Sequence, residues 1–187
     1  MEEKLALLQE HIRVLKERKR PVLVALEGGS ASGKSTLGAA LANKLDATLV
    51  HMDDFFLPLA LRTPERFAQP GGNVHWERVL EEVLQPLAAG KTPEYGVFDC
   101  SVMAVNRTLR AEVRDVVIVE GAYALHPALR DFFDLKVFLS VDPETQKVRI
   151  LARNGEKMLQ RFVKEWIPLE QTYFAACGVE ECCDLVL

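Results

Sequence analysis

The sequence predicts an α/β fold built on a doubly wound, parallel, five-stranded sheet. Continuous apolar runs such as VLVAL (22–26) and VVIVE (116–120) are typical of strands covered on both faces. A glycine-rich turn joins the first run directly to a helical stretch. Helical patterns separate the strand-like runs, and this alternation favours parallel strands with crossover helices. At 187 residues, we expect a single domain over 1–187.

The first elements follow from hydrophobic spacing and turn residues. Apolar residues three and four positions apart predict an amphipathic N-terminal helix within residues 1–20, which ends before Pro21. The strand at 22–26 comes next. The pattern then predicts a helix at 34–45 and a second strand at 47–51, ATLVH.

The segment 57–113 has the least regular pattern. It contains a loop rich in Pro and Gly at 57–73, a helix around 75–88 and a hairpin within 93–113. Long insertions between regular elements usually carry function. We therefore expect this segment to be a substrate-binding insertion.

The C-terminal part alternates again between strands and helices. Its strands are expected at 116–120, 135–141 and 184–187. Asp142-Pro143 has the composition of an N-cap followed by the first helical residue, so a helix begins at 143. We expect Gly155 to interrupt it, Pro168 to kink the helical stretch that follows, and Gly178 to end that stretch.

Composition argues against several classes of protein. The 23 basic and 27 acidic residues give a formal charge of −4, so no overall field attracts nucleic acid or an anionic membrane. No apolar run approaches the length of a membrane span, and the N-terminus lacks a signal-peptide pattern. We expect a cytoplasmic protein with no nucleic-acid or membrane partner, and a homo-oligomer remains an open option. The four cysteines lack metal-ligand spacing and are expected to be reduced thiols.

The turn after the first strand matches GxxxxGK[ST], the phosphate-binding P-loop. In such a loop, backbone N–H groups and the start of the helix surround the phosphates, and Lys34 reaches the β and γ oxygens. The hydroxyl of Ser35 is suited to Mg²⁺. The pattern predicts ATP and Mg²⁺ as cofactors, with a simple Gly/Ser-rich helix cap as the alternative. The predicted nucleotide-binding residues are Gly28, Gly29, Ser30, Ala31, Ser32, Gly33, Lys34, Ser35 and Thr36.

Carboxylates follow two of the predicted strands. Asp53 and Asp54 come after the second strand, and Glu120 ends the third, VVIVE. Because parallel strands open on the same edge of a sheet, these groups should lie near the P-loop. Transfer of a phosphoryl group to a hydroxyl needs a carboxylate that orients the hydroxyl and accepts its proton. We assign that role to Asp53, with Asp54 as a helper or ribose ligand and Glu120 on the Mg²⁺ side; an Asx-turn and a structural strand-end Glu are the alternatives.

Arg149 and Arg153 stand four residues apart on the helix that begins at 143. Both guanidinium groups therefore project from one face. In a kinase, such a face can close over the phosphates as a lid, here expected at 143–160, and supply donors to the transition state. A solvated helix face is the alternative.

The segments GGSASGKST, HMDDFF, VIVEGAYAL and RILAR, in this order between Val22 and Tyr173, resemble the uridine kinase family of P-loop kinases, which includes nicotinamide riboside kinases. The resemblance implies a nucleoside-kinase type of fold. It also implies that Asp53 is the general base, that Ser35 and Glu120 lie on the magnesium side, and that Arg149 and Arg153 are lid arginines. Phe56 stands where several uridine kinases carry a tyrosine, and we expect it to bind the substrate. The family's substrate contacts fall on His75, Tyr95 and Asp99.

Together these features predict a small-molecule kinase that moves the γ-phosphoryl group of ATP to a hydroxyl. The ribose 5′-OH of a nucleoside such as uridine or a pyridine riboside is the acceptor we expect. Another small alcohol, such as pantothenate or glycerate, is an open alternative. So is a non-catalytic module in which bound nucleotide regulates a partner surface.

Overall fold

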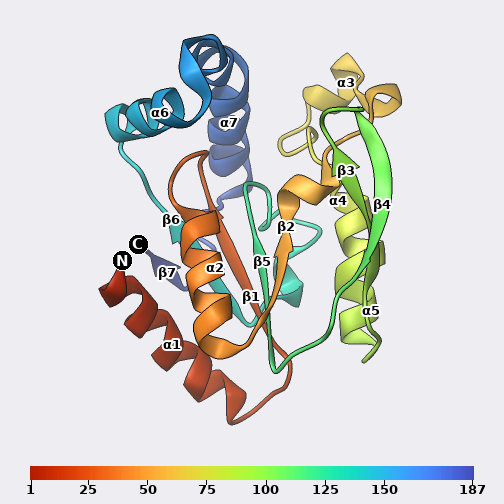
Figure 1. The fold of residues 1–187 in the computed structure, drawn as a ribbon, viewed down its shortest axis with the longest axis vertical. Helices are drawn as coiled ribbons and strands as arrows, with labels where there is room; N and C mark the ends of the chain where they lie inside the picture. Colours follow the sequence, from red (N-terminus) through yellow and green to blue (C-terminus); the bar gives the residue numbers. More distant parts are fainter.

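The computed structural model describes residues 1–187 and contains a parallel five-stranded sheet with helices on both faces (Figure 1). The strand order is β2-β5-β1-β6-β7, and every neighbouring pair is parallel. The strands are β1 (Val22–Gly28), β2 (Thr48–His51), β5 (Val116–Glu120), β6 (Leu135–Leu139) and β7 (Leu185–Val186). The predicted doubly wound sheet is confirmed.

The two central strands explain the continuous apolar runs of the sequence. All residues of β1 and β5 are buried, since layers of protein cover both faces. Val22 pairs with Val116 and Leu26 with Glu120. This register brings the end of β1, where the P-loop starts, beside the end of β5.

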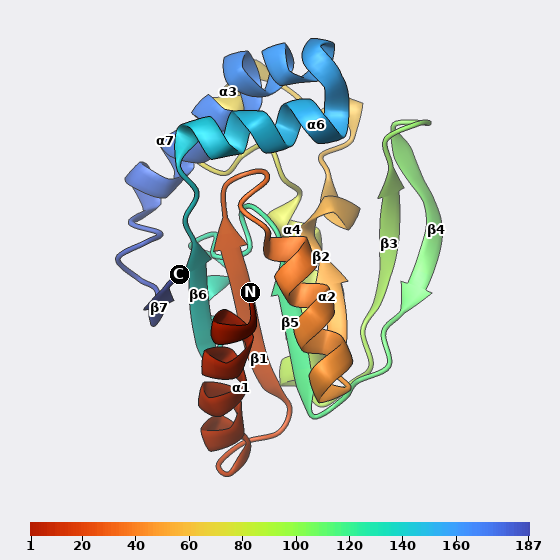
Figure 2. The same ribbon diagram turned by 60° about the vertical axis from the view of Figure 1, so that its left-hand side comes forward.

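One face of the sheet is covered by α1 (Glu2–Lys16) and α2 (Lys34–Leu45), which lie side by side in Figure 2. Leu5, Leu8 and Ile12 of α1 pack with Leu37 and Leu41 of α2 in one hydrophobic cluster. The expected N-terminal amphipathic helix is therefore present, and its apolar stripe covers the sheet.

The insertion after β2 contains short helical turns, one helix and a hairpin. The turns are η1 (Met52–Phe55), η2 (Leu59–Leu61) and α3 (Pro64–Phe67), so the expected loop has some local structure. The helix consists of α4 (Trp76–Arg78), the wide π-type turns η3 (Val79–Leu84) and α5 (Gln85–Ala88). The hairpin has antiparallel strands β3 (Glu94–Asp99) and β4 (Ala104–Arg110), and it stands to one side of the main sheet in Figure 2. The helix and hairpin agree with the prediction.

The last helices lie over the edge where β1 ends (Figure 1). In α6 (Pro143–Arg161), Asp142 accepts a hydrogen bond from the backbone N–H of Thr145 at 2.9 Å, and Gly155 has a φ of 78° that breaks the helix as expected. The wide turns of η5 (Phe162–Trp166) lead into α7 (Ile167–Cys177). The kink expected at Pro168 takes the form of the wide η5 turns, which lie just before this residue. Pro168 has no backbone N–H, so it cannot donate a hydrogen bond to a carbonyl of the preceding turn. Gly178 ends α7 with a φ of 55°.

The connection between β5 and β6 contains the short 3₁₀ helix η4 (Arg130–Phe132). None of the helices has both the length and the hydrophobicity that a membrane span requires. All four cysteines are free thiols, in agreement with the sequence-based expectation.

Candidate active site

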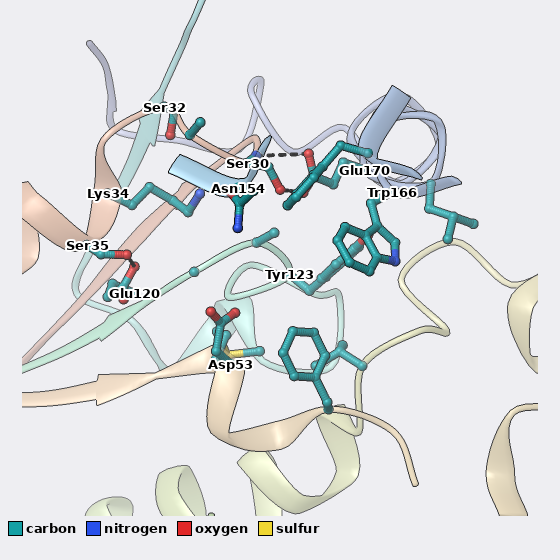
Figure 3. Close-up of a pocket in the computed structure, with 18 of the residues that line it drawn as sticks. Ser30, Ser32, Lys34, Ser35, Asp53, Glu120, Tyr123, Asn154, Trp166 and Glu170 are labelled. Carbon is teal, nitrogen blue, oxygen red and sulfur yellow. Dashed lines mark hydrogen bonds between the residues drawn. The ribbon is translucent and has the colours of Figure 1, made fainter. Parts of the chain in front are cut away.

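A cavity of about 1070 Å³ lies at the carboxyl edge of the sheet (Figure 3). Its walls come from the P-loop, the start of the insertion, the loop after β5, and helices α6 and α7. Pockets for a single small ligand usually measure roughly 300–1,000 Å³. The cavity is therefore large enough for two ligands side by side.

The P-loop has a backbone shape that requires glycine at its start. Gly28 has a φ of 142°, and a Cβ there would lie 2.3 Å from the carbonyl oxygen of Leu139. Gly33 has a φ of 103° immediately before α2. Residues 30–36 line the cavity, whereas Gly28 and Gly29 lie behind them. The Lys34 ammonium donates to the Gly29 carbonyl at 2.8 Å, so it already lies within the curve of the loop.

Two side chains from the last helices fix the tip of the P-loop. The Glu170 carboxylate accepts from the backbone N–H of Ser30 at 2.9 Å and also from its hydroxyl. The Gln146 amide donates to the Ser30 carbonyl at 2.8 Å. Sequence analysis missed both contacts, because no local pattern links residues more than one hundred positions apart.

The Ser35 hydroxyl donates to the Glu120 carboxylate at 3.1 Å, which brings the two predicted magnesium-side residues together. The other Glu120 oxygen lies 2.6 Å from Nδ1 of His51, and this interaction raises the pKa of His51. A hydroxyl and a carboxylate are hard oxygen donors, and Mg²⁺ sites commonly use one or two protein oxygens together with phosphate and water. The residues present fit that ion.

Asp53 projects from η1 into the same cavity as Lys34 and Glu120 (Figure 3). Its carboxylate is open to the cavity, yet protein atoms surround it on the remaining sides. That surrounding and the charge of Glu120 raise the pKa of Asp53, while Lys34 opposes the shift. Asp53 is thus a carboxylate with increased basicity close to the phosphate-binding loop.

The two predicted lid arginines, Arg149 and Arg153, also line the cavity. The Arg149 guanidinium donates to the carbonyls of Ala31 at 3.1 Å and Ser32 at 3.4 Å, so it lies over the P-loop. Arg153 donates instead to the Asn154 side chain at 2.7 Å. One arginine is therefore docked on the P-loop, and the other lies on the same wall without a loop contact.

The part of the cavity beyond Asp53 has aromatic and aliphatic walls beside polar side chains such as Arg62 and Arg161. Phe56 and Met103 come from the insertion side, and Phe162 and Trp166 come from the segment that precedes α7. The rings of Phe162 and Trp166 pack edge to face with centroids 4.5 Å apart, and Arg161 lies over the Trp166 ring at 4.8 Å. The sequence analysis identified only Phe56 of this group.

Four predicted substrate residues do not line the cavity: Asp54, His75, Tyr95 and Asp99. Tyr95 is buried beside Phe55, with ring centroids 5.2 Å apart. Asp99 accepts hydrogen bonds from Ser101 and Asn106 and shapes the hairpin turn. His75 precedes α4, and its backbone N–H donates to the carbonyl of Phe55. Asp54 is half-buried. These four side chains therefore would not contact an acceptor bound in this cavity.

Glu27 is a buried carboxyl group that sequence analysis missed. One oxygen accepts from the backbone N–H groups of Gly28 at 2.8 Å and Tyr123 at 3.1 Å. The other accepts from the N–H of Leu125 and the hydroxyl of Tyr173, both at 3.0 Å. Complete burial outweighs these four hydrogen bonds and raises the pKa of Glu27 to about 7. The only signal in the sequence is a single charge at the end of an otherwise apolar run.

Comparison with known proteins agrees with this arrangement. The family described as chloramphenicol phosphotransferase-like protein matches residues 21–158. A uridine kinase from Clostridium botulinum is 30% identical over 148 residues, which cover 73% of this chain and 70% of the relative. The chain belongs to the uridine kinase-like family of P-loop kinases. A uridine kinase from Lactiplantibacillus plantarum is also 30% identical, over 159 residues that cover 80% of this chain and 71% of the relative.

Solved structures show the same fold over nearly the whole chain. A protein from Bacillus stearothermophilus described as a possible uridine kinase superposes with a TM-score of 0.70 at 21% identity, covering 96% of this chain and 98% of that protein. A candidate fructose transport system kinase from Silicibacter sp. TM1040 gives a TM-score of 0.69 at 27% identity and covers 98% of each chain. The predicted P-loop kinase fold is confirmed, and the chain is a phosphotransferase of the small-molecule kinase type.

Proposed function

We propose that this kinase transfers the γ-phosphoryl group of ATP to a hydroxyl of a nucleoside-like acceptor, with the ribose 5′-OH as the reacting group. The observation that carries the proposal is the shared cavity. Lys34, the Ser35–Glu120 pair and the Asp53 carboxylate line the same space, and its remaining volume suits a second ligand.

In this proposal, the N–H groups of the P-loop and Lys34 hold the β- and γ-phosphates of ATP. Ser35 and Glu120 would hold Mg²⁺, which neutralises phosphate charge when bound. Asp53 accepts the proton of the acceptor hydroxyl as its oxygen attacks the γ-phosphorus. The bond between the γ-phosphorus and the bridging oxygen breaks, and that oxygen leaves with ADP. Arg149 and Arg153 stabilise the charge on the transferring group.

The apolar walls beyond Asp53 support an acceptor with a flat ring. Trp166, Phe162 and Phe56 offer aromatic surface on two sides of the space next to the proposed base. Aromatic side chains bind planar rings through stacked or edge-to-face contacts. A uridine or pyridine riboside has such a ring attached to the sugar that carries the reacting hydroxyl.

A free sugar is a second candidate acceptor. It is supported by the match over 98% of each chain with the candidate fructose transport system kinase. A sugar has no aromatic ring to occupy the apolar walls, so this candidate ranks below the nucleoside.

The test is an ATP-consumption screen over uridine, cytidine, pyridine ribosides, fructose, pantothenate, glycerate and chloramphenicol, with mass spectrometry of the products. We expect ADP and a singly phosphorylated riboside in equal amounts. Lys34→Ala is the control and should remove both products. ATP hydrolysis that is slow and independent of every acceptor would contradict the proposal and favour a nucleotide-binding regulatory module.

A further inference from the structure

The first turn of α1 reaches the cavity that contains the P-loop. Lys4 and Met1 line this cavity together with Thr36 and Leu37 of α2 and Leu139 at the end of β6. Helix α1 contacts α2, and Figure 2 shows the start of α1 beside α2. The chloramphenicol phosphotransferase-like match begins at residue 21, so α1 lies outside the matched region.

The position of Lys4 is fixed by the packing of its helix. Leu5, Leu8 and Ile12 are 4%, 0% and 0% exposed and pack against the sheet and α2. A helix attached through three fully or nearly fully buried side chains does not swing away from the cavity without exposing them to water. Lys4 directly precedes the first of these residues and is therefore held at the cavity wall.

Lys4 has no partner within the chain. It takes part in none of the ion pairs or side-chain hydrogen bonds, whereas Arg13 and Lys16 of the same helix are paired with acidic residues. The Lys4 side chain is also half-buried. The ammonium group of a half-buried side chain that makes no ion pair is available to a ligand that enters the cavity.

The location of Lys4 indicates which part of a nucleotide it meets. Asp53 and the apolar acceptor walls lie on one side of the P-loop, so the γ-phosphate of a bound nucleotide points to that side. The strand order places Leu139, at the end of β6, across β1 from Asp53, which follows β2, and Thr36 and Leu37 of α2 line the cavity together with Lys4. A nucleotide whose phosphates lie in the P-loop therefore has its nucleoside end along these residues.

We propose that Lys4 binds the nucleoside end of the phosphoryl donor, with its ammonium group donating to oxygen or nitrogen acceptors of the ribose or the base. This inference rests on the proposed function. It makes α1 a part of the donor site in addition to its role in covering the sheet.

The test measures binding of ATP, ADP and inorganic tripolyphosphate to the full chain by calorimetry. Lys4→Met removes the ammonium group and keeps an unbranched side chain of similar length. Lys44→Ala is the matched control, because Lys44 is an exposed and unpaired lysine on α2 that does not line the cavity. Thermal melts establish that each variant is folded.

In Lys4→Met, we expect the dissociation constants of ATP and ADP to rise about tenfold, the scale of a lost hydrogen bond from a charged group. Tripolyphosphate affinity should stay within about twofold of wild type, since this ligand has no nucleoside end. Lys44→Ala should change neither.

Two results would overturn the inference. Unchanged ATP affinity in Lys4→Met means that the ammonium group makes no contact. An equal loss of tripolyphosphate affinity means that Lys4 acts as a general positive charge on the phosphates. If wild-type protein binds ATP but phosphorylates no acceptor, the proposed function fails while the role of Lys4 in binding is still decided by the same titrations. If the wild type does not bind ATP, both fail.

Discussion

The phosphate side and the acceptor side of the cavity are built in different ways. On the phosphate side, polar groups already contact one another: Lys34 with Gly29, Ser35 with Glu120, and Arg149 with Ala31. On the acceptor side, aromatic and aliphatic side chains line the cavity beside polar ones such as Arg62 and Arg161. The apolar side chains come from the insertion side, with Phe56 and Met103, and from the segment before α7, with Phe162 and Trp166, which are distant in the sequence.

This difference reflects the chemistry of the two ligands. Phosphates have fixed geometry and charge, so a short loop of backbone N–H groups with one lysine suits every nucleotide. An acceptor is recognised by its shape and apolar surface, which different segments can supply. The phosphate side should therefore determine the rate of transfer, and the acceptor side should determine which molecule is phosphorylated.

The largest effect is expected for Asp53→Asn, at the junction of the two sides. The amide keeps the shape of the side chain but cannot accept the acceptor's proton, so kcat should fall by about 10² or more with little change in ATP affinity. Steady-state kinetics at saturating ATP and acceptor measure this. Asp54→Asn is the matched control, since Asp54 does not line the cavity. If Asp54→Asn is the damaging change and Asp53→Asn is nearly silent, the general base has been assigned to the wrong residue.

Arg149 and Arg153, the predicted lid arginines, test whether the phosphate side acts on the transition state. In Arg149→Lys and Arg153→Lys the positive charge remains and the planar fork is lost, so kcat should fall by about tenfold in each while ATP affinity changes only a few fold. Paired kinetic and direct binding measurements separate the two quantities. Wild-type kcat in both variants would mean that neither arginine acts on the transition state.

Glu27 tests whether an ionised carboxyl group buried beneath the P-loop lowers the free energy of unfolding. Its folded pKa of about 7 lies above the ordinary 4.5, so the folded state binds this proton more tightly than the unfolded state. The contribution of Glu27 to the free energy of unfolding is therefore fully present below pH 4.5 and is lost as the pH rises through 7. Between pH 6 and 8 this contribution falls by about 1 kcal/mol.

The measurement is chemical denaturation of the wild type and Glu27→Gln at several pH values. The wild type should lose stability relative to Glu27→Gln as pH rises. Burial lowers the pKa of His126 to about 4, so this residue lowers the free energy of unfolding as the pH falls below 6.5. His126 is present in both proteins, so its contribution cancels when their free energies of unfolding are subtracted. Parallel pH profiles for the two proteins would show that Glu27 does not titrate in this range.

The smallest effect is expected on the acceptor side. Trp166→Ala removes an aromatic wall and should raise the acceptor KM about fivefold, with kcat and ATP affinity little changed. Trp166→Phe keeps a ring and should retain most of the affinity. Acceptor titrations at saturating ATP measure both variants. An unchanged KM for every acceptor would mean that Trp166 does not bind the acceptor. The proposed contrast between the phosphate side and the acceptor side would then be wrong.

The sequence alone was sufficient for the sheet, the P-loop and the proximity of the strand-end carboxylates. These features depend on local rules: apolar runs become buried strands, a short glycine motif joins strand to helix, and parallel strands open on one edge. For this reason Lys34, Ser35, Asp53 and Glu120 were found from spacing and all line the cavity. The breaks at Gly155 and Gly178 were also visible, because glycine favours a positive φ.

Only the tertiary structure decided which distant side chains reach the site. Glu170 and Gln146 contact Ser30, Glu27 joins two loops, Trp166 lines the acceptor side and Lys4 reaches the cavity, while Tyr95 and Asp99 lie away from it. No spacing rule relates these residues, because they meet only after separate segments have packed together. Strand and turn preferences act over a few residues, so they can be read from the sequence. The direction in which a side chain points at the cavity depends on the orientation of its whole helix or strand, and the burial of apolar faces sets that orientation.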